Sequence, residues 1–113
     1  MKAVYQMAGF LKEYFPINFA RIILISQIVL ALIKVKTVSL NEIAAGFAGK
    51  TKTDSNERRM RRFFKDFSLD PDFIALFVAS KLPGGKWLLT VDRTEWEFGK
   101  IKINILMLAV VYK

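Results

Sequence analysis

Hydrophobic residues recur every three or four positions over the N-terminal two thirds of the chain, the spacing that places them on one face of a helix. This spacing predicts helices over residues 3–15, 17–35, 40–47 and 54–67, and one from Pro71 to the segment 82–85. Pro16 ends the first helix, because proline has no backbone N–H to continue it. The N-terminal part of the chain is therefore predicted to be a small helical bundle.

Polar residues at three of the predicted helix starts have the spacing of N-terminal caps. Ser39 and Glu42 match a capping box, in which each side chain accepts a hydrogen bond from the other residue's backbone N–H. Asp54 and Glu57 repeat this spacing. Asp70 directly precedes a proline, as an N-cap precedes the first helical position.

The predicted helix 54–67 has two different faces and follows helix 40–47 after a polar turn, 50–53, an arrangement typical of a helix-turn-helix. Its apolar residues have the spacing of a core-facing stripe: Met60, Phe63, Phe64 and Phe67. Its basic residues lie on the other side, with Arg59 at the flank: Arg58, Arg61, Arg62 and Lys65. Like charges at this spacing repel, and only Glu57 and Asp66 are near enough to offset them. The pattern favours contact with nucleic-acid phosphates over the alternative, an inert solvated face.

Basic residues are concentrated in one short segment of the chain. The formal net charge is +8, and residues 50–65 hold seven basic and two acidic side chains, more than half of the excess. Such concentration favours an anionic partner at one place on the protein. Double-stranded DNA is the predicted partner, and the candidate contacts are Lys50, Lys52, Arg58, Arg59, Arg61, Arg62 and Lys65.

Residues 87–112 have a different pattern, which predicts two β-strands. The run from Trp87 to Val91 is short and rich in large or β-branched apolar residues, and it stops at the carboxylate of Asp92. Residues 101–112 are apolar at both alternating sets of positions, as in a strand covered on both faces. A connection of about seven to nine residues favours an antiparallel hairpin. Asp92 is thus expected at the rim of the first strand.

The segment 82–85, Leu-Pro-Gly-Gly, separates the two patterns and is the predicted domain boundary. Residues 1–83 are expected to form a helical DNA-binding region, and residues 86–113 the first two strands of a second domain. The predicted fold class is α+β: an N-terminal helical bundle with a helix-turn-helix, followed by a β-hairpin.

Composition restricts both the location and the chemistry. The apolar helical segment 22–33 has twelve residues between Arg21 and Lys34, whereas a membrane span needs about 20, so no membrane span is predicted. The mixed charged and apolar start lacks a secretory signal, which favours the cytoplasm.

The chain has no Cys and no His, which excludes disulfides, cysteine nucleophiles and the usual zinc sites. A metal site here would use carboxylate oxygens and hold Mg²⁺ or Mn²⁺.

Two stretches of the hairpin region carry a family resemblance: Leu89-Thr90-Val91-Asp92-Arg93-Thr94-x-Trp96-x-Phe98-Gly99-Lys100 and Ile103-Asn104-Ile105-Leu106-x-Leu108-Ala109-Val110. They resemble the insertion-sequence-four family of bacterial DDE transposases, where its ribonuclease-H-like catalytic domain begins. The helical region resembles the part of that family that binds transposon ends. The residues concerned are Arg21, Leu32, Leu40-x-Glu42-Ile43-Ala44 and Arg58-Arg59-x-x-Arg62-Phe63-Phe64.

The resemblance implies a role for Asp92, which matches the first catalytic aspartate of the family. In these enzymes three carboxylates hold two Mg²⁺ or Mn²⁺ ions for DNA strand cleavage and transfer, so Asp92 would be both a catalytic residue and a metal ligand. The other two carboxylates are expected beyond residue 113, and the family's Tyr-x-x-Arg-x-x-x-Glu-x-x-x-x-x-x-Lys signature is absent. The chain alone is therefore expected to be inactive and to bind no metal, as the front of a longer protein.

Three interpretations remain open. The resemblance favours a truncated DDE transposase that binds transposon ends. A stand-alone helix-turn-helix protein, with the hairpin as a dimerisation edge, is the alternative, and a basic membrane-associated protein using helix 17–35 is the third. Without the resemblance, Asp92 would only cap a loop by accepting backbone N–H bonds near Thr94. As the front of a longer protein, the chain would leave an exposed apolar edge on strand 101–112, and copies of it are expected to associate.

Overall fold

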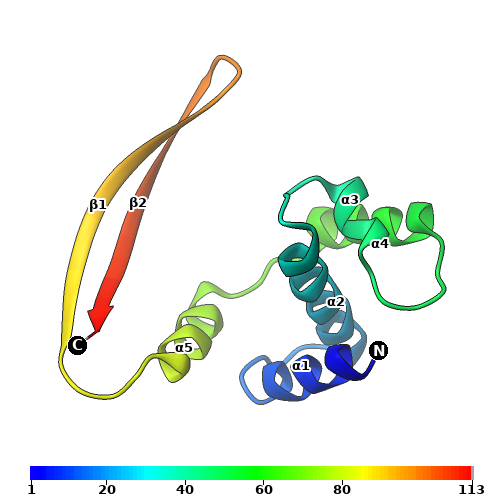
Figure 1. Ribbon diagram of the computed structural model, residues 1–113, viewed down its shortest axis with the longest axis horizontal. Helices are drawn as coiled ribbons and strands as arrows, with labels where there is room; N and C mark the ends of the chain where they lie inside the picture. The colour runs from blue at the N-terminus through cyan, green and yellow to red at the C-terminus, as the bar shows by residue number, and fades with distance from the viewer. Residues whose placement is uncertain (113) are drawn as a thin grey trace. The chain divides into compact units, whose positions relative to one another are not determined.

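Residues 1–112 are described by a computed structural model, in which five helices precede two strands (Figure 1). The elements are α1 (Lys2–Lys12), α2 (Phe19–Val35), α3 (Leu40–Ala45), α4 (Thr53–Asp66), α5 (Pro71–Lys81), β1 (Trp87–Phe98) and β2 (Ile101–Tyr112). The predicted α+β class is confirmed at this level, whereas a ribonuclease-H-like domain stays a proposal. Lys113, the last residue of the predicted second domain, lies outside the described residues. The chain divides into a helical unit, Met1–Ser80, and a hairpin unit, Lys81–Lys113.

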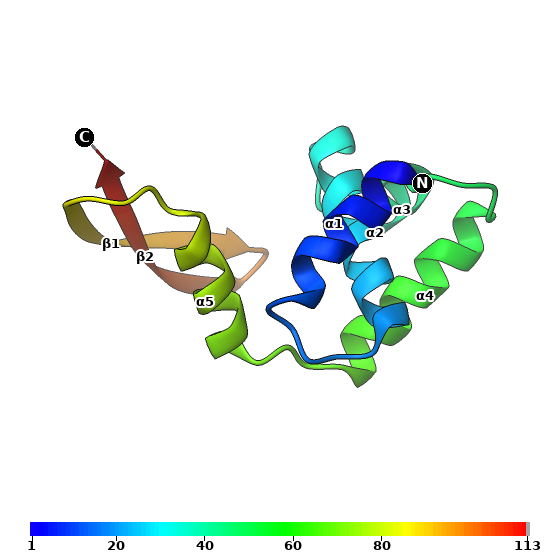
Figure 2. The same cartoon turned by 90° about the horizontal axis from the view of Figure 1, so that it is seen from below.

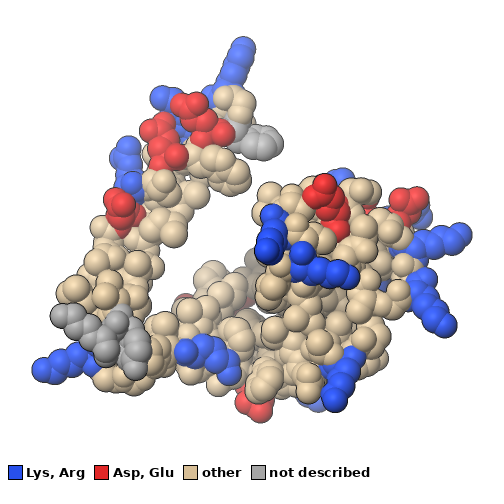
Figure 3. All heavy atoms as spheres, in the orientation of Figure 1, with Lys and Arg blue, Asp and Glu red and all other residues tan. Residues whose placement is uncertain are grey.

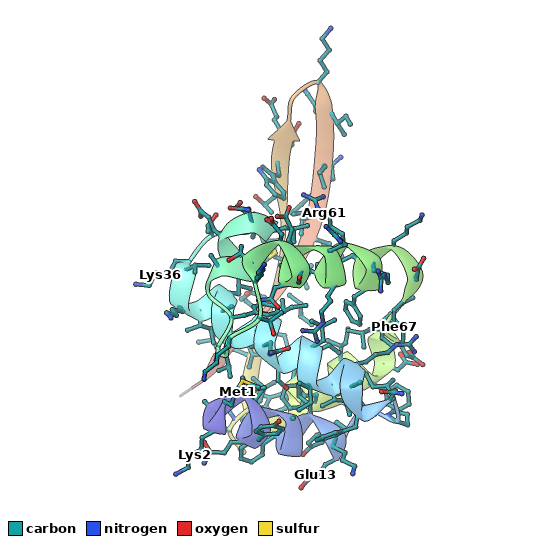
Figure 4. The ribbon with its side chains drawn as sticks, turned by 90° about the vertical axis from the view of Figure 1, so that its right-hand side faces the viewer. Met1, Lys2, Glu13, Lys36, Arg61 and Phe67 are labelled. Carbon is teal, nitrogen blue, oxygen red and sulfur yellow. The ribbon has the colours of Figure 1, made fainter. Side chains whose placement is uncertain are left out.

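Helix α2 is the centre of the helical unit. Figure 2 shows α1 beside it, and Figure 4 shows α1 and α4 on opposite sides of it. Toward α3 and α4, the buried cluster contains Leu24, Ala31, Ile43, Ala44, Phe47 and Met60. Toward α1, the second cluster contains Ala8, Leu11, Phe15 and Ile22, with Leu69, Phe73 and Phe77 packed against it. Because α2 is covered on two sides, its sequence is apolar around most of the helix. No helix within residues 1–112 is long and apolar enough to cross a membrane.

Helix α3 begins at Leu40 as predicted, but its capping and the start of α4 differ from the prediction. The cap of α5 is confirmed, since Asp70 Oδ1 accepts a hydrogen bond from the backbone N–H of Asp72 at 2.9 Å. The two predicted capping boxes are wrong: Ser39 makes no side-chain cap hydrogen bond, and α4 begins at Thr53 instead of after Asp54. Asp54 then lies in the first turn of α4, where a negative charge is favoured by the helix dipole.

Helix α3 ends at Ala45, two residues earlier than predicted. The backbone N–H of Gly46 donates to carbonyls of α3 and closes the helix, while Phe47 turns into the core. The connection to α4 therefore covers the seven residues 46–52, longer than the polar turn that the sequence predicted and than the usual turn of a helix-turn-helix.

Asn56 joins α4 to the end of α3. It is only 4% exposed, and its Nδ2 donates to the carbonyl oxygens of Ala44 and Thr51 at 3.4 Å each. The Ala44 carbonyl belongs to the last turn of α3, where it also accepts a hydrogen bond from the backbone N–H of Phe47 at 3.3 Å. Asn56 therefore fixes the start of α4 against α3 and is not part of a capping sequence.

The hairpin unit is an antiparallel pair in continuous register from Trp87↔Tyr112 to Phe98↔Ile101. The prediction that β1 stops at Val91 is wrong, because the strand continues for seven more residues. The connection is two residues, Gly99 and Lys100, and Gly99 has a φ of +62°. A glycine at the first position of a two-residue loop is typical of a type II′ hairpin turn, which needs positive φ there.

The predicted burial of β2 on both faces is wrong for the hairpin unit. Leu106 is 74% exposed and Leu108 is 65% exposed, and only Ile105 and Val110 are partly buried among the side chains that the structure describes. Tyr112 was also predicted to be buried, but its side chain is not among those that the structure describes. Figure 3 shows charged side chains gathered at the turn end of the hairpin and uncharged ones over the other half. A two-stranded hairpin with this much exposed apolar surface is marginal by itself in water.

The exposed hairpin predicts self-association of the protein. Leu106→Lys with Leu108→Lys should reduce it, because charges on an exposed strand oppose pairing with another chain. The measurement is size-exclusion chromatography at several micromolar concentrations, where the wild type should elute above monomer size. Val38→Lys, the same change at a 77% exposed residue of the helical unit, is the control and should have no effect. Elution of the wild type as a compact monomer would contradict the prediction.

Replacing either of two glycines by alanine should change the stability, in opposite directions. A Cβ at Gly46 would lie 2.8 Å from Val35 Cγ1 and 3.4 Å from Ala31 Cβ, although the backbone φ of −83° suits any residue. Gly46→Ala should therefore lower the free energy of unfolding by about 1–3 kcal/mol through overpacking. Gly9 lies inside α1 with open space around it. Gly9→Ala should therefore raise the free energy of unfolding by about 0.5–1 kcal/mol. Urea unfolding followed by circular dichroism measures both, and effects of the same sign would refute the steric explanation.

Candidate nucleic-acid interface

The buried side of α4 determines which residues face solvent. Met60 is 0% exposed and Asn56 lies beside it in the core, so the opposite side of the helix points outward. Figure 4 shows Arg61 on the side of α4 away from α2, and Phe67 near the C-terminal end of α4 on the side of α2. All seven predicted contact residues are exposed: Lys50, Lys52, Arg58, Arg59, Arg61, Arg62 and Lys65.

The apolar stripe of α4 is narrower than predicted. Met60 is buried, and Phe63 and Phe67 are partly buried, as expected. Phe64 is 55% exposed, so its predicted place in the core is wrong. The core face runs through Asn56, Met60, Phe63 and Phe67, and this axis leaves Phe64 at the margin, where its ring contacts that of Phe63 with centroids 5.6 Å apart. The sequence pattern did not identify Asn56, the polar residue of this core face.

Arg61 is held by an acidic neighbour on the same helix. Its Nη2 and Nε donate to Glu57 Oε1 at 2.7 and 3.1 Å, and Asn41 Nδ2 donates to Glu57 Oε2 at 3.2 Å. The hydrogen bond from Arg61, and then the one from Asn41, hold the pKa of Glu57 below its ordinary value. Of the seven candidate contacts, Arg61 is the one with an ion pair inside the described part of the chain.

A hollow of about 310 Å³ lies between the first turn of α2 and the last two turns of α4. It is lined by Ala20, Arg21, Leu24, Arg59, Arg62, Phe63, Asp66 and Phe67. The guanidinium carbon of Arg21 lies 4.4 Å from the centre of the Phe67 ring, a cation–π contact. The sequence did not predict Arg21 as a contact residue, because it lies far from α4 along the chain and only packing of α2 against α4 brings it there.

Asp92 lies inside β1, not at its end. It pairs with Met107 of β2, it is exposed, and its Oδ1 accepts a hydrogen bond from the backbone N–H of Arg93 at 2.8 Å. The prediction that Asp92 closes the first strand is therefore wrong. Glu95, also on β1, is in an ion pair with Lys102 at 3.6 Å. Within residues 1–112 no group of three or more acidic residues is placed to hold a metal ion, and a single exposed carboxylate does not make a site for Mg²⁺ or Mn²⁺.

Comparisons of the chain with models of protein families, with curated proteins and with solved structures found no match.

The Arg61–Glu57 contact predicts a specific pH dependence. Because the pKa of Glu57 is lower in the folded protein, the stabilisation from this contact is complete above the ordinary glutamate range. It is lost as the pH falls through the folded pKa. Arg61→Ala should raise the pKa of Glu57 toward its ordinary value, as measured by NMR titration of the Glu57 carboxyl carbon.

Arg58→Ala is the matched control for this titration, because Arg58 is the neighbouring cation that does not bond to Glu57. The pKa of Glu57 should stay low in this variant. A Glu57 pKa that is the same in the wild type and in Arg61→Ala would show that the contact does not form in solution.

Proposed function

We propose that this chain binds double-stranded DNA through the outward face of α4, as the end-binding part of a transposase of the insertion-sequence-four family. The observation that carries the DNA proposal is the anchored helix: Met60 and Asn56 are buried, while the basic residues of α4 are exposed on the other side. A cationic row on a rigid helix meets DNA phosphates without first having to be ordered.

The spacing of the basic row supports contact with duplex DNA. Arg58, Arg62 and Lys65 follow one another at four and three positions, so they lie on one face of α4. They span about 10 Å along the helix axis at 1.5 Å per residue, close to the width of about 12 Å of the major groove. Lys50 and Lys52 extend the positive charge into the connection before α4.

The transposase part of the proposal rests on the family resemblance around Asp92 and in the helical region. In a complete ribonuclease-H-like domain, Asp92 would be one of the carboxylate ligands of Mg²⁺ or Mn²⁺. The described residues do not fit such a site by themselves, since no second and third carboxylate stand near Asp92. We therefore expect the chain alone to bind DNA but not to cleave it.

A stand-alone DNA-binding protein is the second candidate, and the exposed apolar hairpin favours it as a dimerisation edge. The two candidates are distinguished by measuring binding to two kinds of duplex. One kind carries the inverted-repeat ends of a transposable element, and the other is palindromic. Binding of the ends as a non-symmetric complex supports the transposase. Binding only to a palindrome as a symmetric dimer supports the second candidate.

The DNA proposal predicts the effect of removing the exposed arginines. Replacing Arg58, Arg61 and Arg62 by Ala should weaken binding and lower the slope of log affinity against log salt by about one for each phosphate that the protein no longer neutralises. Arg61 should contribute least, because it must first leave Glu57. Fluorescence anisotropy with a labelled duplex at several salt concentrations measures both quantities.

Two controls accompany this measurement. Lys100→Ala removes a positive charge from the turn of the hairpin, outside the helical unit, and should leave the slope unchanged. Asp92→Ala should leave DNA binding unchanged, because its carboxylate is outside the helical unit. If the arginine variants bind with the wild-type slope, α4 is not the DNA-binding element.

A further inference from the structure

The hollow between α2 and α4 has an unbalanced charge. Three basic residues line it, Arg21, Arg59 and Arg62, and one acidic residue, Asp66. Across the part of the chain that the structure describes, no ion pair within 4.0 Å involves any of these four side chains. Arginines gathered without partners repel one another, so the arrangement is stabilised when an anion enters.

A neighbouring hollow on the same helix serves as a comparison. It measures about 240 Å³ and is lined by Asp54, Glu57, Arg58 and Arg61, two acidic and two basic residues. There the Arg61–Glu57 ion pair already satisfies one guanidinium. The excess of positive charge is therefore at the C-terminal half of α4, where α2 supplies the third arginine.

The guanidinium group of Arg21 is held in place by a ring contact. Its guanidinium rests on the Phe67 ring at 4.4 Å, a contact that leaves the edge of the planar group, with its N–H donors, free to bond. The helix start next to it is already satisfied, because the backbone N–H of Ala20 donates to Asn18 Oδ1 at 2.7 Å. The donors that the hollow offers to an anion are therefore side-chain guanidiniums, which bind phosphate oxygens in a bidentate manner.

We propose that Arg21 of α2 and Arg62 of α4 hold one and the same backbone phosphate of the bound DNA in this hollow, with Arg59 at its side. The inference rests on the proposed DNA binding and extends it: the interface includes the first turn of α2 and is not confined to α4. Arg62 belongs both to the outward row of α4 and to the hollow, so it connects this phosphate with those along the helix.

The test is a double-mutant cycle on the full chain, with a fluorescein-labelled duplex of about 20 base pairs, roughly two helical turns. Arg21→Ala should weaken binding by roughly tenfold at low salt, as expected when a charge-assisted hydrogen bond to phosphate is removed. The double variant of Arg21 and Arg62 should weaken binding by less than the product of the two single effects, because both side chains hold one phosphate. The double variant of Arg21 and Arg58 should show the full product.

Lys12→Ala is the matched control, because Lys12 also rests on a ring, that of Phe19 at 5.3 Å, but outside the hollow. This variant should bind like the wild type, and circular dichroism checks that all variants are folded. If Arg58→Ala weakens binding and Arg21→Ala does not, the inference is wrong and the DNA proposal stands. Fully independent effects of Arg21 and Arg62 also overturn it. If the wild-type protein shows no salt-dependent binding of the duplex, both proposals fall together.

Discussion

The attachment of α4 to the rest of the helical unit is the constraint on which the candidate interface depends. Met60 has no exposed surface, and Asn56 donates to carbonyls of α3 and of the connection before α4. Together they fix the rotation of α4 about its own axis. A helix that was free to rotate would present its arginines in no defined direction, whereas this one presents a row of cations on one side and a shared hollow with α2 at one end.

Periodicity was sufficient to predict what depends on neighbours along the chain. The helices, the burial of Met60 and the exposure of the basic residues follow from spacing within one element. The capping box at Asp54 failed because α4 begins at Thr53, ahead of the predicted cap, and the Glu57 carboxylate accepts hydrogen bonds from Arg61 instead. The place of Arg21 could not be predicted, since its partners come from a helix distant in sequence.

The hairpin differs from its prediction in the length of β1 and in the exposure of β2. Charged residues alternate with Thr94 and Trp96 after Asp92, which is the alternation of a strand with one apolar side. A strand end at Asp92 conflicts with that alternation, and Gly99 belongs to a two-residue turn instead of a connection of seven to nine residues. The exposure of Leu106 and Leu108 could not be foreseen, because two apolar alternating sets normally mean cover on both faces.

An anchored basic helix is the proposed point of contact with DNA, and the most direct measurement is the change in backbone amide NMR signals of the protein when a DNA duplex is added at low salt. The largest changes are expected in α4, in residues 46–52 and in the first turn of α2. Signals of α1 should change little. Changes confined to the hairpin unit, or none in α4, would contradict the central claim that this helix faces the nucleic acid.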